Sequence, residues 1–242
     1  MRSKARTNAG SAGLPSPPER VIVVHHLNNS RSQRVLWLLE ELGIPYEVKP
    51  YRRDAKTMHA PPELRAVHPL GKSPVISDGA TTLAESGAIL EYLTERYGAG
   101  RFAPAAGSPE RLRYTYWMHF AEGSAMPPLV MKLFFDRIKK GAPFLVRPIA
   151  RAIADQVLNG YVLPNIERQL DFMEGELGKS EWFAGPAFTT ADVQMSFPLD
   201  AATARAGLGD RFPKLTGFLD RIHARPAYKR AIERGGVFAL LR

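Results

Sequence analysis

The sequence predicts an α/β domain followed by an all-helical domain, and three observations support this prediction. Strand-like and helix-like patterns alternate across residues 20–98, first in the order βαβ and then ββα. Residues 99–108 are rich in Gly, Ala and Pro, a composition typical of linkers. Residues 109–242 show helical periodicity without a convincing alternating strand. We therefore expect two domains joined by a linker at 99–108.

The α/β half begins with a predicted buried strand at residues 21–27, a continuous and β-branched run. Apolar residues then recur at three- and four-residue steps up to Gly43, which is a favourable residue for ending a helix. A second short strand begins at Tyr46. A strand, a helix and a strand in this order predict a right-handed βαβ unit.

A hairpin and a helix complete the predicted α/β domain. Residues 74–77 and 81–84 have strand patterns, and between them lies Asp78-Gly79, a dipeptide typical of tight turns. The helix predicted over 85–97 places apolar residues on one face and ends at Gly98.

The second half predicts helices near 109–140, 147–178, 190–207, 213–224 and 227–234. Pro127-Pro128 and the segment 141–148 should kink or interrupt the first two. Thr189 and Asp192 have the spacing of a capping box before the third helix, and Phe188 stands where a hydrophobic staple would. We assign these three residues to folding and not to catalysis.

Residues 1–19 are rich in Ser, Gly, Pro and Ala and lack an apolar period, so we expect a mobile tail. They also lack the apolar core of a secretory signal. No window approaches the roughly 18 consecutive apolar residues that cross a bilayer. These patterns predict a cytoplasmic protein with no membrane partner.

The net charge and the absence of cysteine argue against several classes of function. The net charge is +9, but it forms no dense basic block and accompanies no nucleic-acid recognition motif, so we expect no nucleic-acid partner. A mildly basic surface instead suits small anions. With no cysteine, disulfides, thiolate metal sites and cysteine nucleophiles are excluded. No ligand cluster has the spacing of a metal site, so we predict no metal.

A polar segment at 28–34, NNSRSQR, lies where the first strand ends and the first helix begins. Ligands bind at this edge of open α/β sheets, and helix N-termini favour anions. A serine hydroxyl there could donate a hydrogen bond to a thiolate and so lower the pKa of the thiol. The alternative is that these residues cap the helix, because Ser and Asn are preferred caps.

Two further segments have a functional and a structural interpretation. Pro74 opens a predicted strand, which suits either a cis proline that presents the Ser73 main chain to a ligand or an ordinary trans proline. Eleven residues later, Glu85-Ser86 begins a helix. Ser86 could hold a carboxylate and Glu85 an adjacent ammonium, as in an amino-acid head group, or the pair could serve as a cap.

Taken together, these motifs resemble the glutathione transferase superfamily. The resemblance rests on Ser-x-x-x-Arg after the first strand, Lys-x-Pro, Glu-Ser eleven residues later, and Thr-x-x-Asp in the helical half. The string SRSQRVLWLLEELGIPYEV is similar to the fungal and bacterial branch, which uses serine to activate the thiol. The resemblance implies a thioredoxin-like N-terminal domain, a helical substrate domain, glutathione as co-substrate and a cytoplasmic homodimer.

The resemblance also implies roles for individual residues. Ser30 would activate the thiol, although Asn28, Asn29 and Ser32 remain alternatives. The other glutathione contacts would be the Ser73 main chain before a cis-Pro74, Glu85 and Ser86 at the γ-glutamyl group, Lys72 at the glycine carboxylate, and His59 as another carboxylate contact. Among the aromatic residues and methionines of the first long helix, we select Tyr116 and Phe120 for the electrophile pocket.

The implied activity is conjugation of the glutathione thiolate to small hydrophobic electrophiles, with hydroperoxide reduction as a second reaction. The alternative is a non-catalytic interaction module with the same fold. The complete set of serine, Lys-x-Pro and Glu-Ser motifs favours the enzyme, because an interaction module needs no glutathione site. The segment 140–160 departs from the family pattern because it is longer and interrupted by prolines.

Overall fold

The computed structural model describes residues 21–54, 57, 59–236 and 238, so the predicted tail at 1–19 lies outside the described residues. Its N-terminal half contains a four-stranded mixed sheet in the order β2-β1-β3-β4. The strands are β1 (Ile22–Leu27), β2 (Tyr46–Tyr51), β3 (Val75–Asp78) and β4 (Thr81–Ala84). β1 and β2 are parallel and joined through α1 (Ser32–Leu42), whereas the other pairs are antiparallel. The predicted βαβ unit is confirmed.

The predicted hairpin is also confirmed, with its turn one residue further along. Asp78 still pairs with Thr81, so the connecting residues are Gly79 and Ala80. Gly79 has φ 60°, a left-handed conformation that glycine adopts without steric cost. The buried carboxylate of Asp78 accepts hydrogen bonds from the hydroxyls of Tyr92 and Tyr97, which anchors the hairpin to α3 (Ser86–Tyr97).

One short helix was not predicted. α2 (Pro62–Val67) lies between β2 and β3, where the sequence shows no helical period. Pro62 begins the helix and Glu63 lies in its first turn. Proline at a first helical position and an acidic residue near the N-terminus are both favourable, so the signal was present although too short to show periodicity.

The C-terminal half is helical, as expected. Each of the first two predicted helices consists of two α-helices joined by a π-helical turn: α4 (Pro109–Phe120), η1 (Ala121–Ala125) and α5 (Met126–Gly141), then α6 (Arg147–Val157), η3 (Leu158–Val162) and α7 (Leu163–Leu177). The remaining elements are η2 (Phe144–Val146), α8 (Thr190–Ala206), η4 (Gly209–Arg211), α9 (Pro213–Ala224) and α10 (Pro226–Gly235). None of the described helices is both long and apolar enough to cross a membrane.

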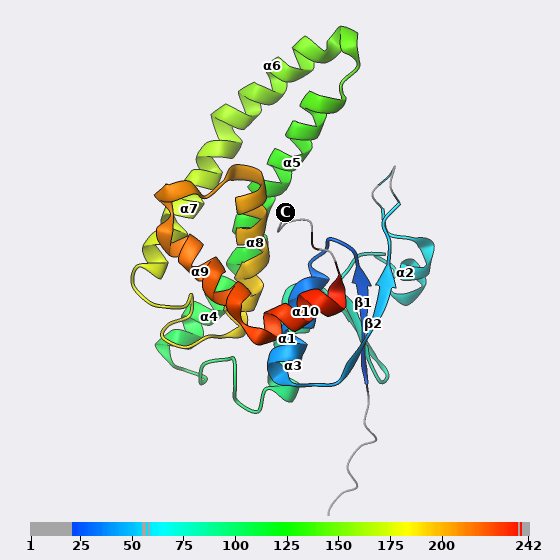
Figure 1. The fold of residues 1–242 in the computed structure, drawn as a ribbon, viewed down its shortest axis with the longest axis vertical. Helices are drawn as coiled ribbons and strands as arrows, with labels where there is room; N and C mark the ends of the chain where they lie inside the picture. Colours follow the sequence, from blue (N-terminus) through cyan, green and yellow to red (C-terminus); the bar gives the residue numbers. More distant parts are fainter. Residues whose placement is uncertain (1–20, 55–56, 58, 237, 239–242) are drawn as a thin grey trace, which may run out of the picture.

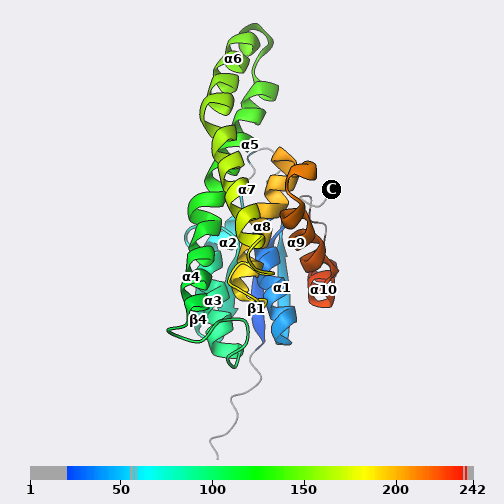
Figure 2. The same ribbon diagram turned by 90° about the vertical axis from the view of Figure 1, so that its left-hand side faces the viewer.

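The unusual segment around 140–160 forms a projecting hairpin. α5 and α6 pack against each other and extend away from the rest of the chain (Figures 1 and 2). Phe144 and Leu145 lie in the connecting turn and are 81% and 87% exposed. The predicted departure from the family pattern therefore corresponds to a distinct structural feature.

The core of the helical half forms around α8, in which every residue from Thr190 to Ala202 is buried. The capping box predicted at its N-terminus is present. Asp192 accepts hydrogen bonds from the backbone nitrogens of Thr189 (2.8 Å) and Phe183 (2.9 Å), and Phe188 packs against Trp37 and Trp182. Burial raises the pKa of Asp192 to about 6, although these hydrogen bonds oppose the shift. These contacts support the assignment of this motif to folding.

The last helix returns to the N-terminal half. α10 packs closely along α1, and Figure 1 shows the two side by side. Arg225 bonds to Glu41, Arg230 and Arg234 bond to Glu40, and Arg234 also donates to the carbonyl of Tyr46 at 2.8 Å. These contacts hold α10 against α1 and the start of β2.

Candidate active site

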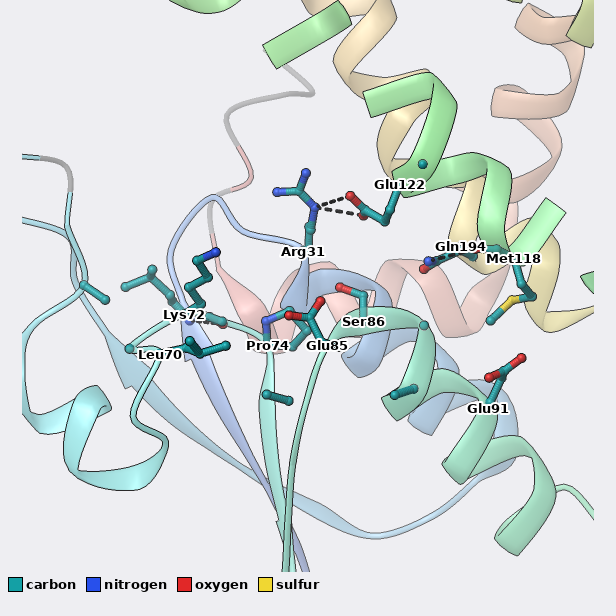
Figure 3. Close-up of a pocket in the computed structure, with 18 of the residues that line it drawn as sticks. Arg31, Leu70, Lys72, Pro74, Glu85, Ser86, Glu91, Met118, Glu122 and Gln194 are labelled. Atoms are coloured by element: carbon teal, nitrogen blue, oxygen red, sulfur yellow. Dashed lines mark hydrogen bonds and ion pairs between the residues drawn. The ribbon is translucent and has the colours of Figure 1, made fainter. Parts of the chain in front are cut away.

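A cavity of about 1090 Å³ lies between the sheet-containing half and the helical half. Figure 3 shows its floor formed by the segment before β3 and by the N-terminus of α3, with α4, η1 and α8 on the opposite side. From the helical half the lining residues are Met118, His119, Glu122, Gly123, Phe134 and Gln194. Because both halves contribute side chains, the cavity can bring together two chemically different ligands.

The structure brings the predicted glutathione-binding residues together in this cavity. Residues far apart in the sequence line the same wall: His59, Lys72, Ser73, Pro74, Glu85 and Ser86. The peptide bond between Ser73 and Pro74 is cis, the form that the family resemblance implies. The six residues occupy one site, and their individual contacts to a ligand remain predictions.

Glu85 and Ser86 lie at the start of α3. Glu85 occupies the N-cap position with φ 71°, and its side chain makes no capping hydrogen bond. Ser86 is buried to 5% exposure, and Figure 3 shows its hydroxyl directed toward the cavity. The backbone N–H groups of this helix terminus are therefore not satisfied by the cap side chain, which leaves an end suited to a carboxylate.

Ser30 lies directly behind the cavity wall. It is 4% exposed, and its Oγ is 3.3 Å from Oγ of Ser73, which lines the cavity. A shorter contact of 2.6 Å joins Ser30 Oγ to Ser32 Oγ. Ser73 in turn donates to the carbonyl of His25 at 3.0 Å and accepts from the backbone nitrogen of Leu27.

The other candidates for thiol activation have different surroundings. Ser32 is fully buried, and its hydroxyl bonds to Nδ1 of His26 at 2.9 Å. The N-cap of α1 is Arg31, without a side-chain capping bond, so Ser32 does not cap the helix. Asn28 accepts a hydrogen bond from the backbone nitrogen of Arg53, and Asn29 adopts φ 51° in the turn. Among Asn28, Asn29, Ser30 and Ser32, Ser30 remains the residue predicted to activate the thiol.

Sequence reasoning missed a charge cluster at the boundary of the two halves. Glu122 in η1 receives hydrogen bonds from Arg31 Nε at 2.8 and 3.0 Å and from Arg34 Nη2 at 2.6 Å. Burial lowers the pKa of Arg34 to about 10, although Glu122 opposes the shift. Burial would raise the pKa of Glu122, but the two arginines outweigh it and lower that pKa. No sequence pattern links these residues, because 88 positions separate Arg34 from Glu122.

The two aromatic residues selected for the electrophile pocket do not line the cavity. Tyr116 and Phe120 stack on each other with ring centroids 5.6 Å apart and also pack against Phe172. They lie on a different face of α4 from Met118, which lines the cavity together with Phe134 of α5. Helical periodicity alone could not tell which face of α4 would meet the cavity.

Comparisons with known proteins match both halves of the chain to one family. Residues 30–96 match the family model for the glutathione S-transferase N-terminal domain, and residues 137–226 match the one for the C-terminal domain. The chain is 38% identical to glutathione S-transferase 3 of Schizosaccharomyces pombe over 215 residues, which cover 88% of each protein. This chain belongs to the glutathione S-transferase family.

Other relatives match a similar share of this chain. Glutathione S-transferase 1 of Saccharomyces cerevisiae is 34% identical over 223 residues, covering 88% of this chain and 95% of that protein. A solved glutathione S-transferase from Actinobacillus pleuropneumoniae has a TM-score of 0.73 and 33% identity, covering 92% and 96%. A family member from Pseudomonas fluorescens, solved with two glutathione molecules bound, has a TM-score of 0.70 and 27% identity, covering 90% and 95%.

Proposed function

We propose that this transferase conjugates the thiolate of glutathione to small hydrophobic electrophiles and also reduces organic hydroperoxides with glutathione. The observation that carries the proposal is the shared cavity. One of its walls gathers the predicted glutathione contacts from the N-terminal half, and the other presents side chains of the helical half. The Pseudomonas fluorescens relative with bound glutathione supports the same use of the fold.

In this proposal glutathione lies along the wall formed by the N-terminal half. Its γ-glutamyl carboxylate binds at the N-terminus of α3 with Ser86, and Glu85 pairs with the adjacent ammonium. The main chain of Ser73 contacts the cysteinyl part, and Lys72 and His59 attract the glycine carboxylate. Arg53 and Arg65 also line the cavity, so the wall is basic enough to favour a ligand with two carboxylates.

The sulfur of glutathione would then lie near Ser30. A hydroxyl that donates to the sulfur stabilises the thiolate and lowers the pKa of the thiol below about 8.5, the value of a free thiol. A larger thiolate fraction near neutral pH means a faster attack on the electrophile.

The electrophile would approach from the helical side. Met118 and Phe134 offer an apolar and adaptable surface there, and they replace Tyr116 and Phe120 in this role. Phe134 belongs to the projecting α5–α6 hairpin and is 56% exposed, so it forms an open side of the cavity. An open apolar side suits small electrophiles of varied shape.

We further propose that the transferase acts as a homodimer in the cytoplasm, with the domains at 20–98 and 109–242. The family membership supports the homodimer, the cytoplasmic location and the two domain ranges. Light scattering at micromolar concentration tests the dimer, and a mass near that of one 26.8 kDa chain would contradict it.

Calorimetry with glutathione, followed by conjugation assays with an activated aryl chloride and reduction assays with cumene hydroperoxide, tests the function. We expect glutathione to bind and at least one assay to show turnover. Lys72→Ala should weaken binding, whereas substitution of Lys179, a lysine paired with Glu176 and not among the cavity residues, should leave binding unchanged. Binding without turnover in either assay would support the interaction module instead.

A further inference from the structure

A row of buried polar groups leads from the cavity wall into the N-terminal half. Ser30 Oγ is 2.6 Å from Ser32 Oγ, and Ser32 Oγ is 2.9 Å from Nδ1 of His26. The three side chains are 4%, 0% and 5% exposed. Ser73 Oγ, 3.3 Å from Ser30 Oγ, is at the cavity end of the row. The imidazole is thus linked to the predicted thiol site through two hydroxyls.

The imidazole is held from its other side by α10. The backbone of Gly235 lies beside the ring and raises the pKa of His26, the direction expected from a nearby carbonyl acceptor. Nδ1 faces Ser32, so Nε2 is the ring nitrogen on the side away from the two serines. The approach is close, because a Cβ at position 235 would lie 2.5 Å from Oε1 of Gln33 and 3.3 Å from Cε1 of His26. The ring is therefore fixed in orientation.

When His26 is neutral, the donor of each hydrogen bond in this row can be assigned. With the proton of the neutral ring on Nε2, Nδ1 is an acceptor and Ser32 donates to it. Ser32 then has no hydrogen left for Ser30, so Ser30 donates to Ser32. Ser73 has committed its own hydrogen to the carbonyl of His25. In the free protein the hydrogen of Ser30 therefore points away from the thiol site.

We propose that His26 takes up the thiol proton of bound glutathione through Ser32 and Ser30, and so acts as a positioning residue for the thiolate. The proposal rests on the proposed function, because it requires glutathione at Ser30. Neither the imidazole nor Ser32 touches the substrate; both act through the Ser30 hydroxyl.

The proton steps balance along the row. The glutathione sulfur gives its proton to Oγ of Ser30, Ser30 gives its own to Ser32, and Ser32 gives its own to Nδ1 of His26. The result is a thiolate and an imidazolium, with every hydrogen bond reversed, so that Ser30 now donates to the sulfur. After conjugation the proton returns along the same hydroxyls to water in the cavity. No oxidant or additional reactant is required.

The surroundings of His26 suit a ring that is neutral until glutathione binds. Burial lowers the pKa of His26, and the hydrogen bond with Gly235 partly opposes this shift. Within the described part of the chain, no charged side chain is among the causes of that shift. The neighbouring charges are engaged elsewhere, Arg34 of α1 with Glu122 and Arg234 of α10 with Glu40. A thiolate at the far end of the row would supply the charge that stabilises the imidazolium.

The chain offers a matched control in the preceding residue. His25 is also 5% exposed and lies on the same strand, and burial lowers its pKa as well. Its ring nitrogens bond to Tyr51 (2.9 Å) and Ser77 (3.0 Å), away from the two serines. A general effect of ligand binding on buried histidines would alter both rings, whereas the relay alters only His26.

Nitrogen NMR of the full chain labelled with ¹⁵N-histidine tests the proposal directly, with the spectra of His26→Asn and His25→Asn providing the assignments. We expect Nδ1 of His26 to change from unprotonated to protonated when glutathione is added. S-methylglutathione, which has no thiol proton, should leave His26 neutral. His25 should keep its protonation state in both complexes.

Ser32→Ala provides the second arm, because it removes the hydroxyl between Ser30 and His26 and leaves the imidazole itself in place. In this variant His26 should stay neutral with glutathione bound, and the thiolate fraction of bound glutathione near neutral pH should fall about tenfold, equivalent to a rise of about one unit in its pKa. A neutral His26 in the wild-type complex, or an unchanged thiol pKa in Ser32→Ala, would overturn the relay while the transferase function stands. Calorimetry that shows no glutathione binding would overturn both.

Discussion

Arg31 and Glu122 face each other across the boundary between the sheet-containing and helical halves, with Nε of Arg31 2.8 and 3.0 Å from the two carboxylate oxygens. Both residues line the cavity, and Figure 3 shows their ion pair above Ser86. The same carboxylate holds the buried guanidinium of Arg34 at 2.6 Å. Glu122 of the helical half therefore neutralises two guanidinium groups, that of Arg31 at the N-cap of α1 and that of Arg34 within α1.

Glu122→Gln should destabilise the chain, because it leaves the guanidinium of Arg34, 1% exposed, without its counter-charge. Removing one member of a buried pair costs about 3–5 kcal/mol, and we expect about 2–3 kcal/mol here because Glu122 is partly exposed. Urea unfolding measures the difference. Glu91→Gln changes another carboxylate of the cavity and should cost well under 1 kcal/mol. Equal losses in the two variants would contradict a special role for Glu122.

Ser86→Ala should raise KM for glutathione about tenfold and change kcat little. The hydroxyl faces the cavity at the start of α3 and should contribute ground-state binding of the γ-glutamyl carboxylate. Steady-state kinetics at varied glutathione concentration measures the change in KM and the change in kcat separately. Should the substitution lower the melting temperature and leave KM unchanged, Ser86 would have a structural role only.

The stability of the free protein should fall as the pH drops below about 6.5. Burial lowers the pKa of both His25 and His26, so below the unfolded value of about 6.5 the unfolded chain binds more protons than the folded one. Each histidine then contributes a slope of up to about 1.4 kcal/mol per pH unit. Urea unfolding between pH 7 and pH 5 should show a smaller slope in His26→Asn. An unaltered slope in that variant would contradict a neutral, buried His26.

Asp192→Ala should impair folding and leave glutathione binding unchanged in the molecules that fold. The carboxylate accepts from the backbone nitrogens of Thr189 and Phe183, and its loss leaves two buried N–H groups unpaired. We expect a loss of about 2–4 kcal/mol. Unfolding curves and calorimetry measure the two quantities separately. A weaker affinity without a loss of stability would contradict the assignment of this motif to folding.

The sequence predicted the order of elements because periodicity and turn residues are local signals. The βαβ unit, the Asp78-Gly79 hairpin and the Thr189–Asp192 capping box all depend on spacings within a few residues. The short helix α2 escaped because six residues are too few to show a helical period. Within the first two long helices, the π-helical turns carried no signal that the sequence analysis could read.

Part of the site was predictable from local motifs, and the part that depends on contacts between distant segments was not. Motifs shared with the family placed Lys72, Ser73 and Ser86 in one cavity although the chain separates them. Contacts between distant segments were not predictable from a single sequence, and the link from Arg34 to Glu122 and the contact of Gly235 with His26 are of this kind. Met118 lines the cavity and the selected Tyr116 and Phe120 do not, a distinction that requires knowing how α4 is rotated.

The central claim is that Ser30 stabilises the thiolate of glutathione. Ser30 lies behind the cavity wall, with its Oγ 3.3 Å from Oγ of Ser73, and it also accepts a hydrogen bond from the backbone nitrogen of Ser32 at the start of α1. Ser30→Ala removes the donor while keeping the shape of the residue. It should lower kcat with an activated aryl chloride more than it raises KM for glutathione, because the lost interaction is with the thiolate.

Ultraviolet titration of the bound thiolate, in wild type and in Ser30→Ala, is the most direct measurement of this claim. We expect a pKa below about 8.5 for the thiol bound to the wild-type protein and a value at least about one unit higher in Ser30→Ala. An unchanged pKa in Ser30→Ala, with the rise appearing instead in an Asn28 or Asn29 variant, would contradict it.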